Sequence, residues 1–448
     1  MERMNEIDSR CLPSDDPLRR VLHNEIHARP SARVRLPALI VYVAVLNEGV
    51  TREQERHHLQ RLPGHADLTA EQLQGNFLRL RCDGFTVKWE RHTEFTRYSI
   101  VQPLPAHALW GSALPGLAPH VATGTDWLRD IPGQTVAAIE LAMLPAGLDQ
   151  PDVLAHAQAW LGEGTLIGSR MGNNSAGQPH SCLLTHFRIG SDGFERMLVL
   201  AAPDTTEGRA GRISQRVLEL ETYRLMALRG LPVAKQLSPV LAEAESRLAD
   251  ITARLEGQQG GDQVLLDDLV GLAARVERAT AEHGYRFSAT RAYDRLVAER
   301  IAELRERPLS GTQTVGEFMQ RRLSPAIATV AATAQRLAAL SERVSRTSAL
   351  LRTRVDIATE AQNQQLLEKL TRGQDLQLRL QSTVEGLSIA AISYYVVSLL
   401  LYGAKALKLA GVPIQPELAA GLMIPLVLWG VWKTVQRIHD RLHRDSAH

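Results

Sequence analysis

Two clusters of histidine and acidic residues have the types and spacing that suit metal or proton chemistry. His23 and His27 lie four residues apart in HNEIHARP, a spacing that lets both imidazoles on a helix face one metal ion. In the strand-like segment KWERHTEF, alternation places Glu90, His92 and Glu94 on one face, where the row would bind a cation or relay a proton. These five residues are the candidate metal ligands.

Each cluster also has a purely structural interpretation. HNEIHARP is not the HExxH motif, and Pro30 indicates the end of a helix, so a hydrogen-bonded helix end is the default there. A row like that at 90–94 is more often a solvated strand face or a salt-bridged contact between domains. An enzyme that used these groups would require all five to converge in one cleft.

Known catalytic patterns are missing from the sequence. It contains no GxSxG motif and no Cys/His nucleophile pair, and the glycine-rich segment 168–177 (GSRMGNNSAG) matches neither phosphate-binding fingerprint. We interpret this segment as a surface loop. The sequence therefore predicts a protein without enzymatic activity, without catalytic residues and without a cofactor.

Composition restricts the partners and the compartment. Lys and Arg total 51 against 49 Asp and Glu, and this balance gives no overall drive toward nucleic acid. Cys11, Cys82 and Cys182 are widely separated, so neither a disulfide framework nor structural zinc is expected, and a reducing compartment fits. The first twenty residues lack the apolar core of a signal peptide, so the N-terminal domain is expected to stay in the cytoplasm.

Two uncharged apolar runs near the C-terminus predict a transmembrane hairpin. They cover Gly386 to Ala404 and Leu418 to Trp432, and the short connection between them returns the chain to the same side. Three basic residues shortly precede the first run, four follow the second, and two lie between them, so the positive-inside rule places both flanks in the cytoplasm. We expect an inner-membrane, multi-pass protein. The alternative is a hairpin buried inside a soluble protein.

The chain before Pro203 is typical of a mixed α/β domain. A helix is expected over 17–27, and another begins at Thr51, which has capping-box spacing to Gln54. Helices interspersed with strands indicate one sheet that helices cover on at least one face. Runs rich in β-branched residues predict strands over 39–46, 77–81, 85–92, 95–101, 136–144 and 197–201.

After Pro203 the sequence favours helices only. Arg209 to Arg229 is interpreted as a core-packing helix, with breaks at 257–261 and 308–311 and a new helix from Ser324. From there an apolar column repeats every seven residues and would form either a coiled-coil seam or the core of an antiparallel bundle. The column consists of Val330, Leu337, Val344, Leu351 and Ala358.

These patterns predict five parts of the chain and one fold class. An α+β or α/β N-terminal domain is followed by a long all-α region and a C-terminal two-helix transmembrane hairpin. The parts are a cytoplasmic α/β domain over 1–203, a helical domain over 204–312, a long helix or coiled-coil stalk over 313–385, the transmembrane hairpin over 386–435 and a cytoplasmic tail over 436–448.

Several long motifs resemble one family. LHNEIHARP, WERHTEF, ETYRLMALRGLP and the segment VDIATEAQNQQLLEKLTRGQDLQLRLQSTVEGLSIAAISYY are similar, in order and over nearly the whole chain, to the proteobacterial domain of unknown function 3422. The resemblance implies membrane anchoring and carries over no catalytic residue. The layout is also distantly similar to that of CorA-like two-span magnesium transporters. Pro416, Glu417 and Leu418 match that family's loop, but Tyr402 to Lys405 stands where its Gly-Met-Asn motif belongs.

The leading hypothesis is a membrane-anchored protein with a cytoplasmic binding, scaffold or sensory domain. Its expected partners are the membrane, a second copy of the chain through the helical region, and a further protein, with no nucleic acid. A CorA-like divalent cation transport protein is one alternative, and a metal-dependent enzyme that uses the His and Glu groups is the other.

Overall fold

The chain forms two compact units. The computed structural model describes residues 15–20, 22–23, 30–109, 115–146, 153–172, 179–257, 261–410, 413 and 415–445. The first unit comprises Met1–Gln259 and Asp267–Thr347, and the second comprises Gly260–Leu266 and Ser348–His448.

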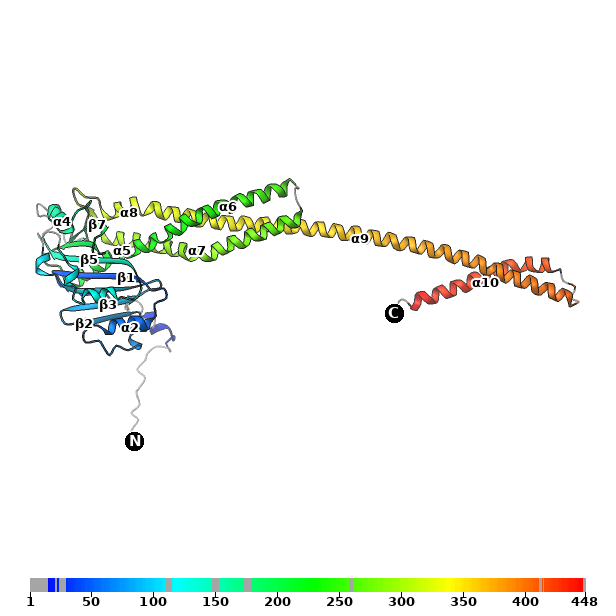
Figure 1. Ribbon diagram of the computed structural model, residues 1–448, viewed down its shortest axis with the longest axis horizontal. Helices are drawn as coiled ribbons and strands as arrows, with labels where there is room; N and C mark the ends of the chain where they lie inside the picture. The colour runs from blue at the N-terminus through cyan, green and yellow to red at the C-terminus, as the bar shows by residue number, and fades with distance from the viewer. Residues whose placement is uncertain are drawn as a thin grey trace, which may run out of the picture. The chain divides into compact units, whose positions relative to one another are not determined.

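One sheet organises the first unit (Figure 1). Within the described residues it has nine strands in the order β2-β3-β4-β1-β5-β8-β7-β6-β9, and every neighbouring pair is antiparallel except the parallel pair β5 and β8. The expected fold class, α+β or α/β, is confirmed, and the mostly antiparallel pairing makes the domain α+β. The strands are β1 (Ala38–Leu46), β2 (Phe77–Cys82), β3 (Phe85–Arg91), β4 (Phe95–Pro103), β5 (Gln134–Pro145), β6 (Ile167–Met171), β7 (Ser181–Ile189), β8 (Glu195–Ala201) and β9 (Arg307–Pro308).

The described helices include the one that the sequence predicts to begin at Thr51. Thr51 caps its helix through the predicted capping box with Gln54, while most of the expected helix over 17–27 lies outside the described residues. The helices are α2 (Arg52–Gln60), α3 (Thr125–Arg129), α4 (Val153–Leu161), α5 (Glu207–Leu228), α6 (Gly230–Glu256), α7 (Asp262–Leu304), α8 (Val315–Arg322), α9 (Ser324–Leu409) and α10 (Pro416–Asp445), with short 3-10 turns at Glu71–Leu73, Ala106–Ala108 and Ala118–His120.

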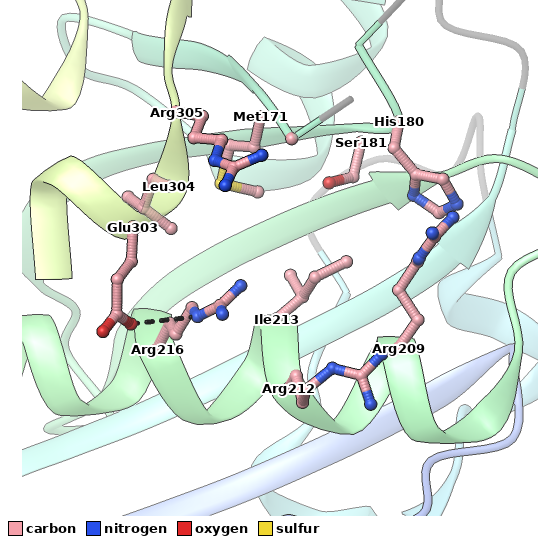
Figure 2. A pocket seen from close by; sticks show the side chains of 11 residues that line it. Met171, His180, Ser181, Arg209, Arg212, Ile213, Arg216, Glu303, Leu304 and Arg305 are labelled. Carbon is pink, nitrogen blue, oxygen red and sulfur yellow. Dashed lines mark hydrogen bonds and ion pairs between the residues drawn. The ribbon is translucent and has the colours of Figure 1, made fainter. Parts of the chain in front are cut away.

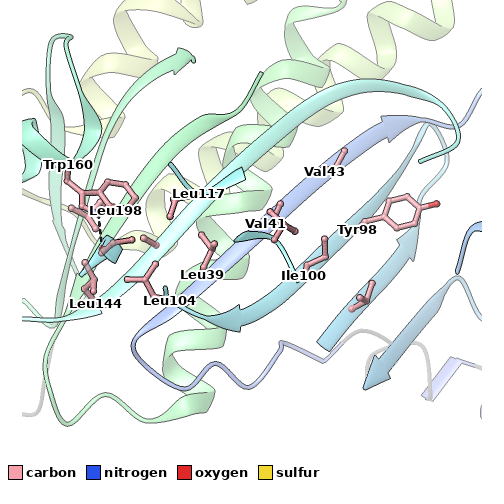
Figure 3. Close-up of a cluster of buried hydrophobic side chains, with 14 of the residues drawn as sticks. Leu39, Val41, Val43, Tyr98, Ile100, Leu104, Leu117, Leu144, Trp160 and Leu198 are labelled. Atoms are coloured by element: carbon pink, nitrogen blue, oxygen red, sulfur yellow. Dashed lines mark hydrogen bonds between the residues drawn. The ribbon is translucent and has the colours of Figure 1, made fainter. Parts of the chain in front are cut away.

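Helices cover both faces of the sheet because successive side chains point to opposite faces and the central strand β1 is apolar along its whole length. One face packs Leu39 and Val41 of β1 against α2, α3 and α4, with Trp160 of α4 fully buried (Figure 3). The other face packs Ile40 of β1 against α5, α7 and α8, with Val217 of α5 in contact with the sheet. The sheet is therefore the middle layer, and the second face borders the candidate functional site.

Helices α6, α7 and α9 pack together in the first unit. Arg336 of α9 pairs with Glu245 of α6 at 2.8 Å, and Arg275 of α7 pairs with Glu243 of α6 at 3.3 Å. The heptad column packs inside its own chain, as the bundle alternative predicts: its first four members are at most 3% exposed, and only Ala358 is exposed.

The second unit contains long apolar stretches of α9 and α10. Two helices are long and apolar enough to cross a membrane, over Val315–Leu409 and Pro416–Arg437, and only 6% of the most apolar window of each is buried. Leu387, Leu399 and Leu422 are 74%, 70% and 80% exposed. A hairpin buried in a soluble core would hide these side chains, so within the described chain the burial pattern disagrees with that alternative.

One buried histidine gives the sheet domain a pH-dependent stability. His58 of α2 is 4% exposed and stacks at 4.2 Å from Trp127, and burial lowers its pKa from 6.5 to about 4. The unfolded chain binds this proton at higher pH than the folded one, so stability that is fully present above pH 6.5 is lost as the pH falls toward 4.

Because of His58, we expect the free energy of unfolding to fall by about 2 kcal/mol between pH 7 and pH 4.5. Urea denaturation followed by tryptophan fluorescence measures it. The matched variant His58→Leu should lose this part of the pH dependence; an unchanged slope in the variant would contradict the assignment.

Candidate functional site

The five residues singled out from the sequence do not gather at one site in the part of the chain that the structure describes. His23 is exposed, and His27 lies outside the described residues. Glu90 is 1% exposed and pairs with Lys88 at 3.2 Å and with Arg97. Among the described residues no group of three or more His, Cys, Asp or Glu side chains has the arrangement that holds a metal ion.

The predicted row at 90–94 is interrupted by a turn. β3 ends at Arg91 and β4 begins at Phe95, so His92 and Glu94 lie in the connection and not on the strand face that holds Glu90. The His92 ring stacks on Phe95 at 4.5 Å, and Glu94 pairs with Arg286 of α7. Alternation fails here because a hairpin needs turn residues where the sequence pattern continues without a break.

The structure assembles a different group of residues, on α5. Arg209, Arg212 and Arg216 recur at helical spacing along one side of the helix, whereas Ala210 and Ile213 are buried against the sheet. The helix therefore holds three guanidinium groups in a row. The first of them is in the first turn, where the helix N-terminus also favours negative charge.

Two distant segments complete the site opposite α5. The ends of β6 and β7 are joined by a hydrogen bond from the His180 amide to the Met171 carbonyl, at 3.0 Å, and the Gly172 amide bonds to the Leu304 carbonyl at 2.9 Å. Arg305 follows with a left-handed backbone (φ 49°), just after α7 ends. These bonds bring the end of α7 beside β6.

The result is a pocket of about 310 Å³, which we call the arginine pocket (Figure 2). Its size is within the range of small-molecule sites. The residues that line it are Met171, Gly172, His180, Ser181, Arg209, Arg212, Ile213, Arg216, Glu303, Leu304 and Arg305.

Positive charge dominates the arginine pocket. Four guanidinium groups face one carboxylate, that of Glu303, which Arg216 contacts at 3.1 Å and Arg300 at 2.8 Å. Among the described residues no carboxylate lies within 4.0 Å of the guanidinium groups of Arg209, Arg212 and Arg305. Three cations thus remain without an ion pair, as at sites that bind phosphate or carboxylate groups.

His180 adds a polar group that the protein itself does not satisfy. It is 5% exposed, yet neither ring nitrogen has a hydrogen-bond partner. Burial, followed by the nearby charge of Arg209, lowers the pKa of this imidazole, so it is neutral at neutral pH and carries one N–H donor. Because buried polar groups are usually hydrogen-bonded, the missing partners make His180 a candidate contact for a ligand. Figure 2 shows the ring beside the Arg209 guanidinium.

Sequence reasoning missed this site, although part of its signal was visible. The spacing of Arg209, Arg212 and Arg216 is readable along α5, but we interpreted that helix as core packing. His180 and Arg305 come from segments far away in the chain and join the site through strand pairing. The segment interpreted as a loop over 168–177 is in fact strand β6 up to Met171, and 173–178 lie outside the described residues.

Together the fold and the site define a class of protein: an α+β domain with a cationic pocket, on a chain that also carries two helices apolar enough to span a membrane. The chain belongs to the family described as "Protein of unknown function (DUF3422)", whose sequence model matches residues 14–442. The resemblance found in the motifs is confirmed. Comparison with curated proteins and comparison with solved structures each found no match.

Proposed function

We propose that this protein is a membrane-anchored, non-enzymatic binding protein whose N-terminal domain takes a small anionic ligand in the arginine pocket. The observation that carries the proposal is the pairing of three guanidinium groups that lack ion pairs with the buried, unpartnered imidazole of His180. Cations and a neutral N–H donor together suit a phosphate or carboxylate group. Hydrated metal cations would be repelled by the same charges.

The anchor is the pair of apolar helices. We propose that α9 and α10 cross the inner membrane as a hairpin, with the sheet domain and the C-terminal tail in the cytoplasm. Support comes from the exposed apolar side chains of both helices and from the excess of basic residues on the two flanks.

Isothermal titration of the full chain in nanodiscs with inorganic pyrophosphate tests the ligand proposal. The variant that combines Arg209→Met with Arg212→Met should bind pyrophosphate about 100-fold or more weakly, because each lost charge-assisted hydrogen bond costs about 1.5 to 3 kcal/mol. Both side chains are exposed, so folding should be unaffected.

A matched control is available on α8. Arg321→Met with Arg322→Met removes the same charge from exposed positions outside the pocket and should leave affinity within about twofold, as expected for weak, screened surface charges. Equal losses in the two double variants would reduce the effect to net charge and contradict a specific pocket.

Self-association through the helical region stays a proposal. The residues that we propose for it are not the buried heptad column but exposed apolar residues later in α9. The heptad column is used within the chain as far as Leu351, whereas Ile357, Leu366, Leu370 and Val384 are each more than half exposed. These α9 residues precede the apolar run, and we propose that they contact a second copy. The cation-transport and metal-enzyme alternatives remain predictions, which liposome flux and activity assays would decide.

A further inference from the structure

A second cavity lies elsewhere in the first unit. It has a volume of about 380 Å³ and is bounded by the β3–β4 turn, the start of α2, and the inner sides of α5 and α7. We call it the aromatic cavity. It shares no residue with the arginine pocket, so a ligand bound in it would be independent of the proposed function.

Aromatic rings form one wall of the aromatic cavity. Phe95 and Tyr223 are buried and form its floor, and Tyr293 lies 6.4 Å from the Phe95 ring and 6.0 Å from the Tyr223 ring. His92 stacks on Phe95 at 4.5 Å. Tyr293 and His92 are only half-buried, so both can offer part of a ring face to a planar ligand.

Cations form the opposite side. Arg52 is fixed by hydrogen bonds to the Leu73 carbonyl and to the Asn76 side chain, and among the described residues no carboxylate lies within 4.0 Å of it. Arg91 is neutralised by Glu55 at 2.6 Å. One oriented guanidinium group therefore remains to bind an anion.

We propose that the aromatic cavity binds a planar aromatic anion, with its ring against Tyr293 and His92 and its negative group on Arg52. The arrangement needs both parts of the ligand, because stacking supplies affinity for any flat ring and the guanidinium group selects the charged ones. The charged group can be the phosphate of a nucleoside phosphate or the carboxylate of an aromatic acid.

Titration of the full chain in nanodiscs with four probes tests the proposal and separates the two ligand sources. Adenosine monophosphate is compared with ribose 5-phosphate, which lacks the base, and 2-naphthoate is compared with acetate. We expect at least one aromatic anion to bind about tenfold or more tightly than its ringless counterpart. Binding of the nucleotide alone, or of naphthoate alone, would identify the source and support the proposal.

Variants locate the bound probe. Tyr293→Leu and Arg52→Met should each lower the affinity for the aromatic anion by about tenfold. Tyr293→Phe retains the ring and should keep the affinity. Arg52 is exposed, so its variant stays informative if Tyr293→Leu fails to fold. The double variant Arg209→Met with Arg212→Met should not change this affinity.

The proposal would be overturned if neither aromatic probe bound, or if each bound no more tightly than its ringless counterpart. It would also be overturned if the arginine-pocket variant abolished binding of the aromatic probe while Arg52→Met left it intact. In that case the probe would occupy the arginine pocket, and the proposed function would stand without the aromatic cavity.

Discussion

Replacing Arg97 by methionine should destabilise the sheet domain by about 3 to 5 kcal/mol. Arg97 is 4% exposed and bridges Glu90 of β3 and Glu219 of α5, the latter at 3.1 Å. Lys88 pairs with Glu90 at 3.2 Å, and Arg300 of α7 pairs with Glu219 at 2.7 Å. The network therefore ties the sheet to both helices.

The destabilisation arises because the carboxylates would stay buried without their main cation. Burial by itself raises the pKa of Glu90 and of Glu219, but the charges and hydrogen bonds of their partners, with Arg97 foremost, together outweigh it and hold both pKa values below their ordinary value. Without Arg97, each carboxylate must either remain charged in a poorly solvated place or take up a proton. Remaining pairs with Lys88 and Arg300 compensate only in part.

Thermal unfolding followed by near-ultraviolet circular dichroism measures the effect. The midpoint for Arg97→Met should fall by about 10 °C, and Arg97→Lys should fall less because it keeps the charge but not the forked geometry. The control Arg129→Met removes a partner of Asp126 from an exposed ion pair, with side chains 74% and 81% exposed, at 2.9 Å. It should change the midpoint by no more than about 2 °C; a comparable drop in this control would contradict the assignment.

Removing residues 386–448 should release nearly all of the protein from membranes. The deletion takes away the apolar run of α9 and the whole of α10. Both segments expose apolar side chains, which are more stable in a bilayer than in water. Removal of residues 436–448 alone keeps both apolar runs and serves as the matched control. After carbonate extraction we expect the full chain and the control in the pellet, and the longer deletion in the supernatant.

Two outcomes would contradict the anchor. If the chain without 386–448 still resisted carbonate extraction, another segment would attach the protein to the membrane. If the full chain were itself extracted, the helices would not span the membrane.

A fluorescent protein fused after His448 tests orientation, because such fusions fluoresce when the C-terminus is in the cytoplasm and stay dark when they are exported. The excess of basic residues on both flanks predicts fluorescence.

The sequence predicted those parts of the fold whose local pattern agrees with their tertiary role. β1 is a continuous apolar strand (ALIVYVAVL) buried on both faces, and α2 begins with its own capping box. β6 (IGSRM) was missed because glycine, serine and arginine occupy its centre, and it is a strand only through pairing with β7 and β9. β9 has two residues and no local signal.

The candidate site was predictable only where its residues share one element. Helical spacing gathers Arg209, Arg212 and Arg216 on α5, but nothing local indicates that His180 and Arg305 face them. Conversely, Glu90 and His92 looked like one chemical group, because alternation was extended through a turn. A buried carboxylate in an ion network and a solvated row of charges share one sequence pattern, and only the packing of α5 against the sheet distinguishes them.

The most direct test of the arginine pocket is the titration of the His180 imidazole itself. With ¹³C-labelled histidine and His180→Gln to assign the signal, nuclear magnetic resonance follows the protonation of this ring with and without saturating pyrophosphate. We predict a pKa below the ordinary histidine value in the free protein, because burial and Arg209 disfavour the charged ring. The pKa should then rise when the bound anion stabilises the imidazolium. The same pKa in both states would contradict the claim that this pocket binds anions.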